Sequence, residues 1–195
     1  MAGAGRQRPP ASQPQQQFWG WHRLHPDRAT ELVRSARIRP GQLVVDLGAG
    51  EGVITEALAS AGARVLAVEL HPHRVDQLRR RFAGVDAVCV LELDLRRFRL
   101  PRRPFRVVAN PPWSLAKPII RMLTAPGSRL VLADLVLQRR LVSDVAARGT
   151  PGSGKHRFTC TSVGAVPRTA FHPAPPHPAA VLRITPSRSS RIARH

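Results

Sequence analysis

The residues that decide the fold are Leu43 to Gly52, which read LVVDLGAGEG. Four of the first five are apolar and surround the single acid Asp46, a pattern typical of a short strand buried on both faces of a parallel sheet. This strand runs directly into three glycines, Gly48, Gly50 and Gly52. Residues 53–59 then have helical spacing without breakers. A strand, a glycine-rich turn and a helix N-terminus in this order predict a nucleotide-type binding crevice.

The glycine spacing narrows the class of ligand. It is G-x-G-x-G, whereas dinucleotide-binding sites have G-x-G-x-x-G. Position 54, two residues beyond Gly52, is an isoleucine and not a small residue. The pattern therefore disfavours a nicotinamide-dependent oxidoreductase.

The charge of the chain indicates its partner. Among 195 residues there are 31 basic and 12 acidic side chains, a formal net charge of +19. A GC-rich genome would explain why only Lys117 and Lys155 are lysines, but it does not explain the shortage of acids. The excess of positive charge predicts a polyanionic partner, namely nucleic acid.

Cysteine usage and hydropathy indicate the compartment. Cys89 and Cys160 lie far apart in strand-like contexts, which predicts two reduced core thiols of a cytoplasmic protein. There is no apolar run of about 18 residues and no apolar stretch behind the N-terminal charges, so we expect neither a membrane helix nor a secretory signal.

The remaining pattern predicts one catalytic domain over residues 18–185, a disordered Gln- and Pro-rich basic arm over 1–17 and a flexible basic tail over 186–195. The aromatic stretch from Phe18 to Trp21 is either a lid, a stacking surface for nucleic acid or an anchor for the first helix. Strands are predicted over 43–47, 63–69, 87–93, 105–109, 129–137, 158–166 and 180–184. Helices are predicted over 27–36 with Asp27 as N-cap, and over 53–59, 72–82, 115–123 and 138–147.

Acids stand at the ends of the second and third predicted strands. Glu69 lies 21 residues after Gly48, where a βαβ nucleotide site places a carboxylate that accepts hydrogen bonds from both ribose hydroxyls. Asp94 ends the third strand, where it is either a turn residue or the acceptor for the amino group of a bound adenine. The two acids beside the glycine turn fit S-adenosylmethionine. His71 and His73 have no further ligand nearby, so we expect no metal site.

The fourth strand delivers the second informative motif, Asn110-Pro111-Pro112-Trp113. Its prolines fix the backbone, so the Asn110 amide oxygen and the Pro111 carbonyl are held in place as acceptors for a planar amino group. Trp113 offers a face on which a base swung out of its stack can lie. An exocyclic amine is a poor nucleophile because its lone pair is delocalised. We expect Asn110, Pro111 and Trp113 to catalyse methyl transfer by positioning such an amine, without a strong base.

Together these residues resemble the erythromycin-resistance (Erm) ribosomal RNA adenine N6-methyltransferases and their dimethyladenosine-transferase relatives. The closing segment Phe171-His172-Pro173-Ala174-Pro175 is similar to that family's F-x-P-x-P. The resemblance implies a doubly wound α/β fold: a Rossmann-like, class I S-adenosylmethionine-dependent methyltransferase whose mostly parallel seven-stranded sheet has an antiparallel last strand. It implies donor contacts by Gly48, Gly50, Glu69, Asp94 and Asn110.

The same resemblance implies a target. This is an adenosine in the peptidyl-transferase region of 23S ribosomal RNA, whose methylation confers resistance to macrolides, lincosamides and type B streptogramins. We expect a monomer that acts on this RNA and does not bind a membrane.

Two departures from the family pattern bear on these expectations. The family opens with Gln-Asn-Phe-Leu, but here the aligned residues are His22-Arg23-Leu24-His25. From this segment we therefore expect donor contacts only through the backbone atoms of Arg23 and His25, and not through side chains. The family also adds a helical C-terminal domain. This chain stops soon after the last predicted strand, so we expect the arginine clusters of the core and the tails to hold the RNA.

Alternatives remain at this stage. The same acceptor motif serves DNA amines and the glutamine amide of proteins, although the charge disfavours a protein substrate. A housekeeping dimethyltransferase for small-subunit ribosomal RNA has the same motifs. A non-catalytic RNA-binding protein on this fold would not need Asn110 or the two acids.

Overall fold

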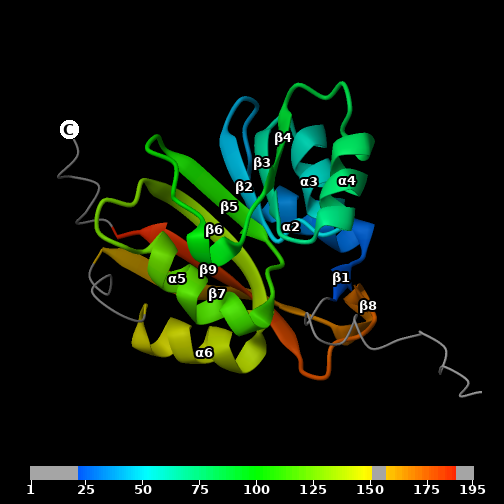
Figure 1. Ribbon diagram of the computed structural model, residues 1–195. Helices are drawn as coiled ribbons and strands as arrows, with labels where there is room; N and C mark the ends of the chain where they lie inside the picture. The colour runs from blue at the N-terminus through cyan, green and yellow to red at the C-terminus, as the bar shows by residue number, and fades with distance from the viewer. Residues whose placement is uncertain (1–21, 151–156, 188–195) are drawn as a thin grey trace, which may run out of the picture.

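The computed structural model describes residues 22–150 and 157–187, in which a seven-stranded sheet has helices on both faces (Figure 1). The strand order is β4-β3-β2-β5-β6-β9-β7. The strands are β2 (Leu43–Leu47), β3 (Arg64–Glu69), β4 (Val88–Glu92), β5 (Phe105–Ala109), β6 (Leu130–Gln138), β7 (Phe158–Val166) and β9 (Ala179–Pro186). The predicted arm, the aromatic stretch 18–21 and nearly all of the predicted tail lie outside the described residues.

The strand directions confirm the predicted fold class. Strands β4, β3, β2, β5 and β6 pair in parallel, and β9, the last strand of the described residues, runs antiparallel to both β6 and β7. The central strand β2 has no solvent contact at Val44, Val45 and Leu47. Burial on both faces explains why this strand reads as a nearly continuous apolar run.

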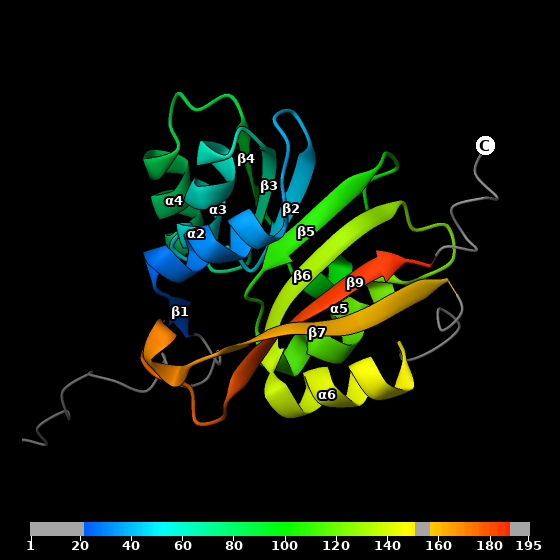
Figure 2. The ribbon, with the colours of Figure 1, turned by 180° about the vertical axis from the view of Figure 1, so that it is seen from behind.

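The helices divide between the two faces of the sheet, as Figures 1 and 2 show from opposite sides. Helices α2 (Pro26–Ser35), α3 (Val53–Ser60) and α4 (Pro72–Arg81) cover one face, and α5 (Ala116–Leu123) and α6 (Arg139–Arg148) cover the other. Separate apolar clusters fill the two layers, with Leu32 and Leu58 in one and Ile120 and Val142 in the other. None of the helices within 22–150 and 157–187 is long and apolar enough to span a membrane.

A second, two-stranded sheet joins the two ends of the described chain, and the sequence pattern did not predict it. Strand β1 (Arg23–Leu24) pairs antiparallel with β8 (Phe171–His172). The His25 N–H also donates to the Ala170 carbonyl at 2.7 Å. This pairing fixes the N-terminal segment beside the carboxyl ends of the central strands.

Two local predictions are corrected. Helix α2 begins at Pro26 with His25 as N-cap, because proline needs no N–H partner in the first turn; Asp27 is inside that turn. Cys160 is buried as predicted, but Cys89 is exposed on the edge strand β4 and is not a core thiol. The other predicted helices and strands lie within a few residues of their predicted positions.

Candidate active site

The glycine turn after β2 adopts a backbone that other residues rarely adopt. Gly48, Gly50 and Gly52 have φ angles of 78°, 58° and 83°. A Cβ atom on Gly48 would lie 3.0 Å from the Pro112 ring, and one on Gly52 would lie 2.7 Å from Leu78 of α4. The missing side chains therefore let the segment after β5 and the helix α4 approach this turn.

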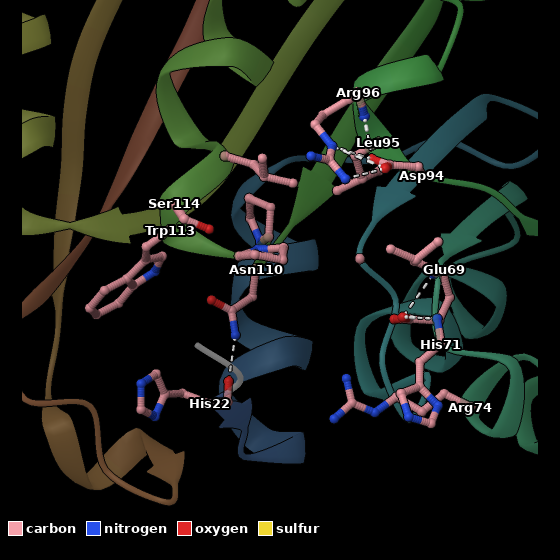
Figure 3. A pocket seen from close by; sticks show the side chains of 15 residues that line it. His22, Glu69, His71, Arg74, Asp94, Leu95, Arg96, Asn110, Trp113 and Ser114 are labelled. Carbon is pink, nitrogen blue, oxygen red and sulfur yellow. Dashed lines mark hydrogen bonds and ion pairs between the residues drawn. The ribbon is translucent and has the colours of Figure 1, made fainter. Parts of the chain in front are cut away.

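Glu69, at the end of β3, is held by main-chain donors around the same turn. Its side chain is only 7% exposed. One carboxylate oxygen accepts from the Gly50 N–H at 2.8 Å, and the other accepts from the N–H groups of Leu70 and His71 at 2.8 and 2.9 Å (Figure 3). The oxygen that accepts from Gly50 has a further lone pair, whereas the other oxygen already uses both of its lone pairs. The carboxylate thus supports the glycine turn and can still accept a hydrogen bond from a ligand.

The carboxyl ends of four neighbouring parallel strands surround a cavity of about 270 Å³. Six of the predicted site residues line it, namely Gly48, Glu69, Asp94, Asn110, Pro111 and Trp113. Ligands of open α/β sheets bind at this edge, near the point where the strand order reverses. The structure therefore brings most of the predicted residues together at one crevice.

The remaining predicted site residues, Arg23, Gly50 and His25, do not line this cavity. Arg23 lines a smaller adjoining cavity together with Asp46 and Asn110, and its guanidinium pairs with Glu51 at 2.8 Å. Gly50 contributes its N–H to Glu69. His25 lines neither cavity, and its exposed side chain stands at the N-terminus of α2. The structure does not bring His25 to the crevice.

Asp94 is paired with a neighbouring arginine at the rim of the cavity. Its carboxylate accepts from the Arg96 side chain at 2.6 Å and from the Arg96 N–H at 2.9 Å. The hydrogen bonds from the Arg96 side chain, more than those from its backbone, hold the pKa of Asp94 below its usual range. Asp94 is therefore an ionised acceptor at neutral pH.

The side-chain amide of Asn110 is oriented by the backbone of the N-terminal segment. Its Nδ2 donates to the His22 carbonyl at 2.7 Å (Figure 3). Because a carbonyl can only accept, this contact assigns the amino end of the amide to His22 and leaves the Asn110 Oδ1 as an acceptor. The sequence did not reveal this role of His22, since a backbone contact leaves no side-chain pattern.

Trp113 follows Asn110 by three residues and begins the short 3-10 helix η2 (Trp113–Leu115). Its ring N–H donates to the Val136 carbonyl at 3.2 Å, which fixes the plane of the indole. The His22 ring lies beside it, with ring centroids 5.8 Å apart and planes inclined by 45°. The cavity thus has an aromatic wall next to the Asn110 acceptor.

Asp46 is a site residue that the motif analysis treated only as a buried acid of the strand. It is 1% exposed, and its Oδ2 accepts from the Thr55 hydroxyl at 2.7 Å. Its Oδ1 has no hydrogen-bond partner within the described ranges. Burial raises the pKa of Asp46 to about 7, the Thr55 hydrogen bond opposes this, and the charge of Glu69 adds to it. A cationic group in the smaller cavity would meet an acceptor that lacks a partner.

Asp46→Asn is expected to stabilise the protein increasingly as pH rises. The pKa of Asp46 is about 7 in the fold and 3.8 in a model peptide, so the unfolded chain binds fewer protons between these values and wild-type stability falls as pH rises from about 4 to 7. Asparagine has no charge to bury and still accepts from Thr55. At pH 8 the variant should be more stable by up to about 4 kcal/mol, with little difference at pH 4.

Thermal unfolding of both proteins across this range is the measurement. A gain in stability that does not change with pH would contradict the assigned protonation of Asp46.

The sheet order and the crevice place the chain in a structural class, the Rossmann-like methyltransferase fold. The crystal structure of the 23S rRNA methyltransferase ErmE superposes with a TM-score of 0.75 at 23% identity, over 83% of this chain and 68% of that one. A dimethyladenosine transferase from Plasmodium falciparum superposes with a TM-score of 0.73 at 20% identity, over 89% and 66%. At these identities the likeness establishes the fold alone.

The sequence establishes the family. The model of the family described as ribosomal RNA adenine dimethylase matches residues 24–192, and this chain belongs to that family. The mycinamicin-resistance protein MyrB of Micromonospora griseorubida is 34% identical over 80% of this chain and 50% of its own length. The ribosomal RNA small subunit methyltransferase A of Synechococcus sp. (strain JA-3-3Ab) is 32% identical over 84% of this chain and 64% of its own length.

A third relative is similar over more of the chain. The rRNA adenine N-6-methyltransferase of Bacillus licheniformis is 29% identical over 90% of this chain and 63% of its own length. The chain thus spans between one half and two thirds of the length of these relatives.

Proposed function

We propose that this chain transfers a methyl group from S-adenosylmethionine to the N6 amine of an adenosine in ribosomal RNA. The observation that carries the proposal is the amide of Asn110. Its amino end is bound to the His22 carbonyl, and its oxygen is left as an acceptor beside a cavity that two strand-end carboxylates also line. Family membership supports the same chemistry.

The residues present fit the donor. Glu69 keeps a free lone pair on the oxygen that accepts from Gly50, which suits a ribose hydroxyl. Asp94 is an ionised acceptor, paired with Arg96 in this structure, that suits the adenine amino group. The smaller cavity has the carboxylate oxygen of Asp46 without a partner, which suits the ammonium of the methionine end. S-adenosylmethionine bound here would supply an electrophilic methyl group on a sulfonium.

The chain's own residues then prepare the nucleophile. The Asn110 Oδ1 and the Pro111 carbonyl accept hydrogen bonds from the two N–H groups of the amine. They thereby favour a pyramidal nitrogen whose lone pair is withdrawn from conjugation with the ring and points at the methyl group. The bond between the methyl carbon and the sulfur would break as the new N–C bond forms, and the methylated nitrogen would then lose one proton to water. Trp113 holds the base after it has left its stack. Positioning of this kind accounts for about 7–11 kcal/mol of a reaction barrier. The arrangement needs no general base of high pKa.

We further propose an Erm-type target, an adenosine in the peptidyl-transferase region of 23S ribosomal RNA, with resistance to macrolides, lincosamides and type B streptogramins as the result. The similarity to the mycinamicin-resistance protein supports this target. The second candidate is dimethylation of small-subunit ribosomal RNA. The similarity to the Synechococcus small-subunit methyltransferase, at nearly the same identity, favours it.

A methyl-transfer assay separates the two candidates. Purified protein is incubated with tritium-labelled S-adenosylmethionine and with protein-free transcripts of 23S or 16S RNA, and the labelled nucleotide is mapped. We expect label on one adenosine of the peptidyl-transferase region of 23S RNA. Label confined to 16S RNA would replace the Erm-type target by the small-subunit one. Absence of label on both transcripts and on ribosomal subunits would contradict the proposed reaction.

A further inference from the structure

Within the part of the chain that the structure describes, one half of the sheet has no helix on one of its faces. The crossovers β2–β3, β3–β4 and β5–β6 contain the α-helices α3, α4 and α5. The crossover from β4 to β5, residues 93–104, contains only the three-residue 3-10 helix η1 (Leu95–Arg97). Leu95 and Phe98 of this segment pack into the apolar cluster that includes α5, on the face away from α3. Beside them, β3 and β4 present side chains that none of the described helices covers.

A groove of about 820 Å³ lies at this place. Its floor is apolar, and half-buried leucines of three strands form it: Leu43, Leu66 and Leu91, with Leu93 next to β4. The groove starts near the amino ends of β2, β3 and β4 and follows the crossover. It is therefore a surface separate from the crevice at the carboxyl ends.

Five exposed arginines line the groove, namely Arg64, Arg97, Arg99, Arg102 and Arg103, against a single carboxylate, Asp86. None of the five makes an ion pair or a side-chain hydrogen bond with any residue in 22–150 or 157–187. Some arginines elsewhere are paired: Arg81 contacts Glu56, and Arg183 contacts Asp134. The arginines of the groove are thus uncompensated charges around an apolar floor.

The crossover connects this groove to the candidate active site. Asp94, Leu95 and Arg96 line the cavity that contains Asn110, and the residues directly after them, Arg97 and Phe98, line the groove. A strand of nucleic acid whose one base enters the cavity can therefore continue along the crossover without leaving the surface.

We propose that this groove, defined by the five arginines and the leucine floor, binds single-stranded ribosomal RNA that flanks the target adenosine. Guanidinium groups bind phosphates and stack on bases, and the apolar floor suits the faces of unstacked bases. The inference rests on the proposed function, because the RNA class follows from it. It adds a binding surface within this domain, outside the crevice that holds the reacting base.

The charge on the groove limits the other occupants. The sequence after residue 187 contains Arg188, Arg191 and Arg194 and no acidic side chain, so its charge disfavours it as the occupant of the groove. An acidic peptide has the right charge, but its binding would not explain why the groove continues into the cavity that contains Asn110. RNA accounts for the charge, the apolar floor and the continuity together.

The first test measures RNA affinity. Arg97, Arg99, Arg102 and Arg103 are replaced together by glutamine, and binding of a fluorescein-labelled, protein-free 23S transcript is followed by anisotropy at several salt concentrations. We expect affinity to fall at least about tenfold near 0.15 M salt, and the log–log salt slope to become shallower by up to about 3, since each lost phosphate contact accounts for about 0.7 on a single strand.

The matched control removes the same charge from the opposite face. Arg34, Arg37, Arg39 and Arg80, on α2, the loop after it and α4, are also exposed and are replaced by glutamine in the same way. We expect this variant to lose clearly less affinity than the groove variant. Equal losses in the two variants would show that only net charge matters and would overturn the proposal.

Cys89 reports the location of the RNA. Its thiol is exposed on β4 and lines the groove, whereas Cys160 is buried and burial raises the pKa of its thiol to about 11. N-ethylmaleimide should therefore modify Cys89 first, and saturating RNA should slow that reaction in the wild-type protein. Unchanged Cys89 reactivity with RNA bound, or protection by polyglutamate but not by RNA, would overturn the proposal.

Failure of the proposed reaction is a separate outcome. Protection of Cys89 and loss of affinity in the groove variant would uphold the groove as an RNA surface even if no methyl group were transferred. Full methyl transfer with unchanged RNA affinity in the groove variant would refute the groove and leave the reaction intact.

Discussion

Replacing Asn110 by alanine is expected to lower the rate of methyl transfer at least about 100-fold, the typical cost of removing one preorganised hydrogen-bonding group from an active site. The substitution deletes the Oδ1 acceptor and also the 2.7 Å hydrogen bond to the His22 carbonyl. The amine would then keep its lone pair in conjugation with the ring. Single-turnover transfer of a labelled methyl group to RNA measures the effect.

Donor binding separates this role from a structural one. Asn110→Ala should bind S-adenosylhomocysteine, measured by calorimetry, with affinity close to that of the wild type, because Glu69 and its backbone partners are untouched. Gln42→Ala is the matched control: it removes an amide that accepts from the Arg39 N–H at the opposite end of the sheet, and it should turn over normally. Wild-type turnover in Asn110→Ala would refute the assigned role.

Glu69→Ala is expected to weaken donor binding at least about 100-fold. Alanine removes the ribose acceptor and leaves three main-chain N–H groups, those of Gly50, Leu70 and His71, without their partner. A buried donor without a partner costs about 1–3 kcal/mol, and Glu69 is 7% exposed, so the glycine turn should loosen as well. Calorimetric titration with S-adenosylhomocysteine measures the loss.

A neighbouring glutamate provides the control for this variant. Glu56 on α3 is exposed and pairs with Arg81, and it lines neither cavity. Glu56→Ala should therefore bind the donor like the wild type. Equal affinity of Glu69→Ala and wild type would remove Glu69 from the donor site.

Patterns within a short segment predicted those helices and strands that the spacing of their own residues determines. Val44, Val45 and Leu47 around one acid indicated a central strand, and this strand is fully buried. The prediction that Glu69 and Asn110 meet at one crevice also holds, because strand ends in a parallel sheet share an edge. These inferences need only the spacing of residues along the chain.

Such patterns could not predict contacts between backbone segments that are far apart in the sequence. The pairing of β1 with β8 and the His22 carbonyl that orients Asn110 involve main-chain atoms, which every residue has. The unpaired oxygen of Asp46 depends on what surrounds a buried strand. The prediction for Cys89 was wrong because an edge strand and a central strand have similar sequences; only the sheet order shows that β4 is the edge strand of the described sheet.

The most direct test of the central claim is a crystal structure of the protein with S-adenosylmethionine bound. The account predicts Glu69 at the ribose and the sulfonium methyl facing the gap between the Asn110 Oδ1 and the Pro111 carbonyl. A nitrogen held by these two acceptors would then lie about 3–3.5 Å from the methyl carbon, the separation of a reactive pair. A donor bound with its methyl turned away from Asn110, or bound outside this crevice, would contradict the account.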